Sequence, residues 1–198
     1  LIPQYVLILP RPDHPGQYDI LHQWIKSTPT LNYAAQILRS RADLNLNWGY
    51  GEVIDKNILV LEDSLFWGKL AACRHANGRD WWVLTGQRNS NIYQSILIDP
   101  LGIHPQATQT IGQPIVDGLG QAVFSPDGNW YARAETYSFA TGNSVSLYRF
   151  DRCSGLLSDP VQIAYADSAI AMGAAFSPNS RFLYVSSTRY IYQFDTWA

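Results

Sequence analysis

The chain has 198 residues, of which 46% are hydrophobic, 13% aromatic and 15% charged, and its formal net charge is -2. This composition excludes an intrinsically disordered chain, because the apolar residues are numerous enough to bury a large core. The fourteen basic and sixteen acidic residues form no run of like charge, so neither nucleic acid nor an anionic membrane is an expected partner. No segment approaches the roughly 20 consecutive apolar residues of a transmembrane helix, so we expect no membrane insertion.

The N-terminal part of the chain is predicted to form four β-strands, because short segments rich in β-branched and aromatic residues are separated by turn residues. These strands are expected at residues 5–9, 17–25, 33–38 and 53–61. Segment 31–44 also contains the helix formers Ala34, Ala35 and Leu38 at partly helical spacing, which favours a helix. Its place in the repeat described below favours a strand, and a strand is our prediction.

Two later segments repeat one motif about 50 residues apart. Residues 122–128 read AVFSPDG, residues 174–180 read AAFSPNS, and residues 73–78 form a more degenerate copy. Proline presets φ for a tight turn, Asp or Asn bonds its own backbone, and glycine tolerates positive φ. We therefore expect structural turns at Ser125, Pro126, Asp127, Gly128, Ser177, Pro178 and Asn179.

Each copy reads strand, turn, strand, loop, strand and Asp, and in two copies a proline-bounded loop follows, at residues 100–105 and 155–160. A further strand is expected after each loop, which makes four strands per unit. Four-stranded units with a period of about 50 residues are typical of a β-propeller. The predicted fold is all-β, a β-propeller of four-stranded antiparallel blades at about residues 1–62, 63–117, 118–168 and 169–198.

The length corresponds to about four units, at the lower limit of blade number in propellers. The chain begins at Leu1, has Met172 as its only methionine, and ends just after Asp195, where a fourth strand is expected. We therefore expect a part of a larger propeller, with the remaining blades of the parent chain as partners. The alternative is a closed ring of four blades in which residues 4–9 complete the last blade.

The sequence resembles bacterial WD40-like or YVTN-type propeller repeats in its Phe-Ser-Pro-Asp-Gly turn, its Leu-Tyr-Arg-Phe-Asp strand and its C-terminal Phe-Leu-Tyr-Val-Ser-Ser and Ile-Tyr-Gln-Phe-Asp segments. More narrowly, residues 8–12, 51–57 and 69–85 are similar to propeller regions of secreted surface proteins of gliding Bacteroidetes. The narrower resemblance implies export and an extracellular or cell-surface location.

His75 stands in the turn position that serine holds in the other two copies, and Arg79 follows nearby. One interpretation is a polar ligand site at a blade edge, and the other is a turn residue that bonds its own backbone. The aromatic residues, among them Trp48 and Trp67, present a choice between stacking platforms for sugars and packing between blades, and we favour packing. The candidate ligand-binding residues are His75, Arg79 and Trp67.

Two segments have metal-like spacing, but neither predicts a metal site. His14 lies near two aspartates, but the adjacent Pro15 and Gly16 indicate a turn. Residues 43–49 read DLNLNWG, with the glycine one position late for a calcium loop, and Ile54 stands where that loop needs an acid. We therefore expect a turn and a strand edge at these places.

The sequence contains no G-x-S-x-G, no H-E-x-x-H and no glycine-rich phosphate loop, so it predicts no catalytic residue and no cofactor. Cys73 and Cys153 form no close pair, and we expect two unpaired thiols. The predicted function is a non-enzymatic interaction or structural module of a secreted or surface protein, which presents blade loops to a protein or glycan. The alternatives are a lactonase-like or other hydrolase propeller and an intracellular WD40-type scaffold.

Overall fold

The computed structural model describes residues 4–29, 32–114, 116, 120–138, 142–165 and 171–198. These residues form fifteen β-strands, β1 to β15 in chain order, and one short 3-10 turn at Asn47–Gly49. The described part of the chain contains no helix that is long and apolar enough to cross a membrane. The prediction of an all-β chain is confirmed.

The strands form four antiparallel sheets, and the strands of each sheet are consecutive in the chain. The first sheet contains β1 (Val6–Pro10), β2 (Gln17–Ser27), β3 (Asn32–Asp43) and β4 (Glu52–Leu65). The second contains β5 (Ala71–Arg74), β6 (Trp81–Gly86), β7 (Ile92–Asp99) and β8 (Gly102–Thr110). The third contains β9 (Gly120–Phe124), β10 (Trp130–Ser138), β11 (Gly142–Asp151) and β12 (Leu156–Tyr165). The fourth contains β13 (Ala171–Phe176), β14 (Phe182–Ser187) and β15 (Ile191–Asp195).

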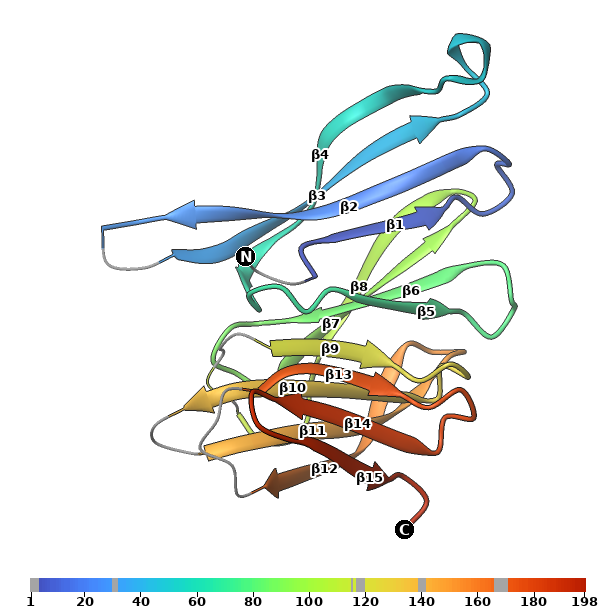
Figure 1. Cartoon of the computed structure of the whole chain (residues 1–198). Coiled ribbons are helices and arrows are strands. Elements are labelled where there is room, and N and C mark those ends of the chain that lie inside the picture. The colour runs from blue at the N-terminus through green and yellow to red at the C-terminus, as the bar shows by residue number, and fades with distance from the viewer. Residues whose placement is uncertain (1–3, 30–31, 115, 117–119, 139–141, 166–170) are drawn as a thin grey trace.

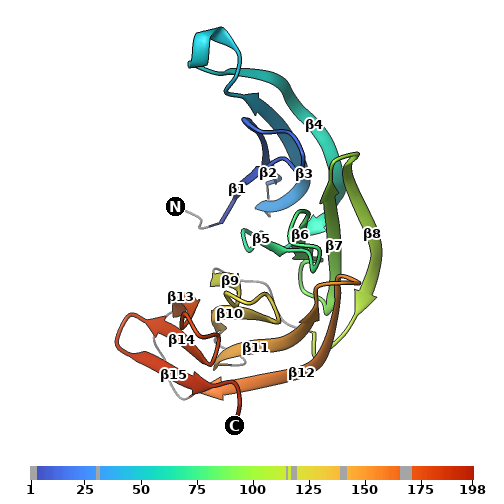
Figure 2. The same ribbon diagram turned by 90° about the vertical axis from the view of Figure 1, so that its right-hand side faces the viewer.

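The four sheets are arranged side by side in an open arc (Figure 1, Figure 2). The first strand of each sheet lies on the inner side of the arc, namely β1, β5, β9 and β13 (Figure 2). The outermost strands of the first three sheets are β4, β8 and β12. This radial order of antiparallel sheets is that of propeller blades, so the fold is propeller-like, as predicted.

The alternative of a closed four-blade ring is wrong. Residues 6–10 form β1, which pairs with β2 inside the first sheet and therefore does not complete the last blade. In the described residues the fourth sheet has three strands, and the arc stays open between this sheet and the first one (Figure 2).

The hydrophobic core lies between neighbouring sheets. The cluster between the first and second sheets includes Leu21, Ile37, Val83 and Ile96. The cluster between the second and third sheets is mainly aromatic and includes Phe66, Trp82, Tyr93, Tyr131, Tyr148 and Phe150. The cluster between the third and fourth sheets includes Trp130, Val145, Leu183 and Val185. Face-to-face burial of apolar side chains therefore holds the sheets in the arc.

The segment with helix-like composition is the strand β3, as predicted. Its neighbours in the sheet are β2 on one side and β4 on the other, so both edges of β3 are hydrogen-bonded. Ala34 and Ile37 are fully buried in the cluster against the second sheet. Pairing on two edges and burial outweigh the helix propensity of the alanines, because propensity is a weak preference that tertiary context overrides.

The predicted proline-bounded loops at residues 100–105 and 155–160 are wrong in extent. β8 already begins at Gly102 and β12 at Leu156, so Pro105 and Pro160 lie inside strands. Both strands are the outermost of their sheets, where a missing N–H removes no ladder bond on the solvent side. The pairing register also shifts next to each proline, which accommodates its ring.

Candidate functional site

The turns that join the first two strands of each sheet all lie at the same end of the strands, on the right-hand side of Figure 1, and so along one face of the arc. They comprise residues 11–16, 75–80, 125–129 and 177–181, and we call them the turn rim. The predicted structural turns belong to this rim. The hairpin loop between β3 and β4, residues 44–51, projects from the same end (Figure 1).

The two Ser-Pro turns have the same hydrogen bonds. The hydroxyl of Ser125 donates to Oδ1 of Asp127 at 2.5 Å and accepts the N–H of Trp130 at 3.0 Å. In the second copy, Ser177 donates to Oδ1 of Asn179 at 2.6 Å and accepts a backbone N–H at 2.9 Å. Each serine therefore closes its turn through its side chain, which explains the repeated sequence.

His75 occupies the equivalent place in the turn of the second sheet. The backbone N–H of His75 donates to the backbone carbonyl of Asp80 at 2.9 Å, and its ring Nδ1 accepts the backbone N–H of Asn77 at 3.0 Å. Arg79 donates from Nε to Oδ1 of Asp80 at 2.7 Å and from Nη1 to Oδ2 of Asp13 at 3.0 Å. Its hydrogen bond lowers the pKa of the Asp80 carboxyl below the usual value. His75 and Arg79 are thus brought together on the turn rim.

Trp67, the third candidate, lies elsewhere. It lies between β4 and β5, on the face of the arc opposite to the turn rim, and it is partly buried. The structure therefore does not bring Trp67 near His75 and Arg79. Trp82, by contrast, is buried between the second and third sheets, where its indole N–H donates to the carbonyl of Arg152 at 2.9 Å.

The acids of the two metal-like segments have protein partners. Asp19 is buried and accepts the Nε–H of Arg41 at 2.9 Å. Asp43 accepts the side-chain N–H of Gln17 at 2.9 Å and the backbone N–H of Asn45 at 2.9 Å. Among the described residues, no group of three or more His, Cys, Asp or Glu side chains is placed to hold a metal ion.

The loop between β3 and β4 presents four apolar side chains to solvent, Leu44, Leu46, Trp48 and Tyr50, which we call the aromatic tip. Trp48 is 98% exposed and Tyr50 is 86% exposed. The expectation that the aromatic residues pack between blades is therefore wrong for Trp48. The long strands β3 and β4 carry this loop beyond the rest of the first sheet, so no neighbouring blade covers it (Figure 1).

The aromatic tip is held in a defined conformation. Asn47 and Trp48 have left-handed φ values of 50° and 58°, which side chains with a Cβ rarely adopt. The N–H of Gly49 donates to the carbonyl of Leu46 at 3.1 Å, and the N–H of Tyr50 donates to that of Asn47 at 3.0 Å. Asparagine accepts this conformation readily, whereas it is uncommon for a bulky residue such as Trp48, so the turn holds the exposed indole in one backbone geometry.

Hydrogen bonds join the aromatic tip to the turn rim. The N–H of Leu44 donates to the carbonyl of Gly16 at 2.8 Å, and the amide of Asn45 donates to the carbonyl of Pro15 at 2.9 Å. The same turn reaches the second sheet through the ion pair between Asp13 and Arg79. The aromatic tip, the first turn and the turn that contains His75 therefore form one continuous surface.

The electrostatics of the tip are simple. Residues 44–51 carry no charged side chain, while Asp43 and Glu52 stand opposite each other at the base of the loop. The hydrogen bond from the backbone of Asn45 lowers the pKa of Asp43 below its usual value. The result is an uncharged apolar projection with negative charge at its base.

No protein-family model matches the chain, and no curated protein sequence matches it either. Similar solved structures include a putative 6-phosphogluconolactonase from Bacteroides fragilis, with a TM-score of 0.55 and 13% identity over 96% of this chain and 54% of that one. A functionally unknown protein from Desulfotomaculum acetoxidans has a TM-score of 0.59 and 16% identity, over 100% of this chain and 56% of that one.

Hydrazine synthase from Kuenenia stuttgartiensis is similar with a TM-score of 0.54 and 13% identity, over 93% of this chain and 51% of that one. The chain therefore spans about half the length of these structures. At such identities the similarity shows the fold alone, and the fold is that of β-propeller-like proteins.

Proposed function

We propose that this chain is a non-enzymatic binding module whose aromatic tip and adjoining turn rim hold a protein partner. The observation that carries the proposal is Trp48, which is 98% exposed in a loop that its own hydrogen bonds hold in place. Burial of one such indole releases about 4 kcal/mol before the costs of association. Tryptophan and tyrosine are also the residues most enriched at the energetic centres of protein interfaces.

The shape and composition of the tip favour a protein over other partners. Leu44 and Leu46 add aliphatic surface beside the aromatic rings, which suits an apolar cleft on a partner. Glycan binding combines a flat aromatic face with several surrounding hydrogen-bonding groups. The amide of Asn45 is already bonded to the carbonyl of Pro15, and the leucines supply no polar group, so Asn47 is the main amide of the loop left for a sugar. A membrane surface is disfavoured, because Asp43 and Glu52 at the base of the tip would be repelled by anionic lipid.

The hydrolase alternative predicts ionisable side chains on the inner side of the arc. The four innermost strands, residues 6–10, 71–74, 120–124 and 171–176, carry a single charged residue, Arg74. Of the four histidines, His14 lies in the first turn and His104 on β8, while His22 pairs with Val6 of β1 and His75 directly follows β5. The near absence of charged residues from the innermost strands supports a binding role. Hydrolysis of a lactone is nevertheless measured as one arm of the test.

We also propose an extracellular or cell-surface location, which rests on the resemblance to propeller regions of surface proteins of gliding Bacteroidetes. An intracellular scaffold would use the same surface. Proteolysis of intact cells separates the two locations, because an external protease removes a surface protein and spares an internal one. Loss of the parent protein under external protease is the expected result, and full protection would contradict the surface location.

The binding role is tested by affinity capture from extracts of the source organism. One capture uses the unsubstituted protein as bait, and another uses the double variant Trp48→Ser, Tyr50→Ser. The matched control is Tyr190→Ser, an exposed tyrosine of 60% exposure in the turn between β14 and β15, away from the turn rim. We expect one partner protein to bind to the unsubstituted protein and to the control variant, and not to the tip variant. Equal retention by the tip variant, or binding of glycans or turnover of a lactone in place of protein binding, would contradict the proposal.

A further inference from the structure

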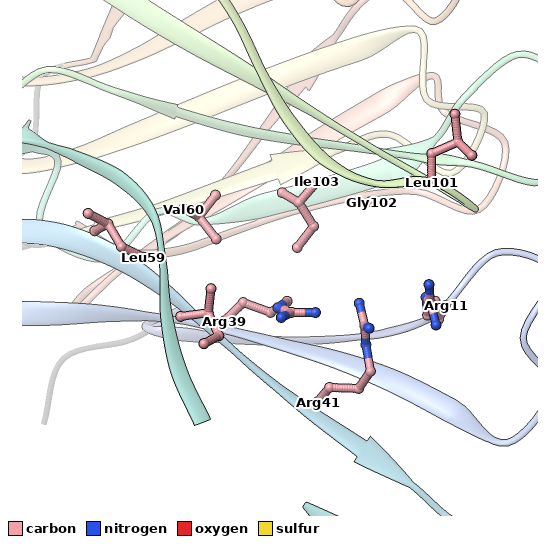
Figure 3. A pocket seen from close by; sticks show the side chains of 9 residues that line it. Arg11, Arg39, Arg41, Leu59, Val60, Leu101, Gly102 and Ile103 are labelled. Atoms are coloured by element: carbon pink, nitrogen blue, oxygen red, sulfur yellow. The ribbon is translucent and has the colours of Figure 1, made fainter. Parts of the chain in front are cut away.

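A cleft of about 310 Å³ opens between the first and second sheets (Figure 3). One wall carries three arginines, Arg11 just after β1 and Arg39 and Arg41 on β3 (Figure 3). The other walls are mainly apolar. Leu59 and Val60 of β4 belong to the first sheet, and Leu101 and Ile103 come from the second sheet. We call this the arginine cleft. Its volume lies at the lower end of the range for small-molecule sites.

Two of the arginines are held by carboxylates. Arg41 donates from Nε to Oδ1 of the buried Asp19 at 2.9 Å, and Arg39 donates from Nη2 to Oδ2 of Asp55 at 2.8 Å. The alternate pairs are longer, at 3.6 Å between Arg39 and Asp19 and 3.8 Å between Arg41 and Asp55. These four groups form a network with balanced charge, which fixes both guanidinium groups along the wall of the cleft.

Arg11 is the surplus cation of the cleft. Its Nη1 donates to Oε1 of Gln17 at 2.7 Å and its Nη2 to the carbonyl of Pro100 at 3.4 Å, both of them neutral acceptors. Its Nε is buried without a hydrogen-bond partner in the described part of the chain. Burial and the neighbouring Arg41 lower the pKa of Arg11, as expected for a cation without its own counter-ion. Three guanidinium groups against two carboxylates leave one net positive charge.

We propose that the arginine cleft binds an organic monocarboxylate whose remaining part is apolar. A single carboxylate neutralises the one surplus charge and accepts hydrogen bonds from the guanidinium edge, the geometry in which arginine binds carboxylates most strongly. Its apolar part packs against Leu59 and Ile103, which line the same cleft. A dianion such as phosphate leaves a net negative charge in the cleft and faces apolar walls, so the cleft fits it poorly.

The inference goes beyond the proposed protein-binding role, because none of the residues of the aromatic tip lines the cleft. The two are therefore separable by mutation: variants of Trp48 should leave carboxylate binding unchanged. Arg11 begins the first turn of the rim, so its variants are read out by benzoate binding and not by capture of the protein partner.

The test uses benzoate as the probe, with benzamide as its uncharged isostere and inorganic phosphate as the dianion. The ¹H–¹⁵N signals of the arginine Nε–H groups are followed by NMR during each titration of the full chain. We expect a saturable shift of the Arg11 signal with benzoate and no saturable shift with benzamide. Substitution Arg11→Gln should weaken benzoate binding by about tenfold or more, since it removes a charge-assisted bond.

The matched control is Arg189→Gln, an exposed arginine in the turn between β14 and β15, which should bind benzoate as the unchanged chain does. Arg11→Lys keeps the charge and loses the planar fork, so its affinity should lie between those of the other two proteins. Absence of a saturable shift at Arg11, equal shifts with benzamide, or tighter binding of phosphate than of benzoate would each overturn the proposal. The NMR signal of Arg11 in the unchanged chain keeps the test valid even if a variant fails to fold.

Discussion

The side chain of Gln109 bonds to both backbone groups of Leu157. Its Nε2 donates to the carbonyl of Leu157 at 2.6 Å, and its Oε1 accepts the N–H of Leu157 at 2.8 Å. Gln109 lies on the outermost strand of the second sheet and Leu157 on that of the third, so one amide side chain joins two blades. Gln4 makes the same pair of bonds with Ala122, at 2.7 Å and 2.9 Å.

From this bridge we predict that Gln109→Ala lowers the free energy of unfolding by about 1–3 kcal/mol, because the backbone groups of Leu157 lose their partner near a buried side chain. The measurement is urea unfolding, with Gln193→Ala on the exposed face of β15 as the control. The control should unfold within about 0.5 kcal/mol of the unchanged chain. Equal stability of the two variants would show that the bridge contributes nothing.

The two cysteines should react very differently. Both are free thiols, as predicted, but Cys73 is buried in the core while Cys153 is exposed in a turn. Burial raises the pKa of Cys73 to about 12, so almost no thiolate forms at moderately alkaline pH. We expect a thiol reagent to label Cys153 alone in the folded chain and both residues in denaturant. Native labelling of the Cys153→Ser variant would contradict the burial of Cys73.

The pH dependence of stability should include a contribution from Asp80. The hydrogen bond from Arg79 lowers the pKa of Asp80 in the folded chain, whereas an aspartate in the unfolded chain titrates near about 4. The stabilisation is therefore fully present above about pH 4 and is lost as the pH falls through the lower, folded value. Urea midpoints measured from neutral to acidic pH should fall less steeply for Asp80→Asn than for the unchanged chain.

The control for this pH series is Asp159→Asn, at an exposed position on β12. Its urea midpoints should follow those of the unchanged chain at every pH. If Asp80→Asn and the control gave parallel curves, the ion pair with Arg79 would have no energetic role.

Substitution of two tryptophans should affect stability to very different extents. Trp82 is 3% exposed between the second and third sheets, and Trp82→Ala should lower the free energy of unfolding by about 3–5 kcal/mol. Trp48 is 98% exposed, and Trp48→Ala should change it by less than about 0.5 kcal/mol. Thermal unfolding of the two variants measures both effects. A large loss for Trp48→Ala would mean that the aromatic tip serves folding and not binding.

The repeated strands and turns could be predicted from the sequence because their signals are local. The hydroxyls of Ser125 and Ser177 act on residues within their own turns, and the flanking segments alternate as strands do. The proline-bounded loops were mispredicted for a tertiary reason. Pro105 and Pro160 are tolerated in β8 and β12 because these strands are outermost, and strand order is not visible in the sequence.

The candidate site could be predicted only in part. The apolar residues at 44, 46, 48 and 50 alternate as in a half-buried strand, and whether a neighbouring blade covers them depends on the length of the hairpin. The cluster of Asn47, Gly49 and Gly51 was a local signal for a loop at this place. The arginine cleft gave no signal at all, because Arg11 approaches Arg39 and Arg41 only through the order of strands in the first sheet.

The most direct test of the proposed binding surface is hydrogen–deuterium exchange of the protein alone and with its captured partner bound. We predict slower exchange in residues 44–51 and in the adjoining turn at residues 11–16, with no change on the opposite face of the arc. Protection confined to residues 66–70 and 86–91 on that opposite face, with unchanged exchange in the aromatic tip, would contradict the assignment of the binding surface.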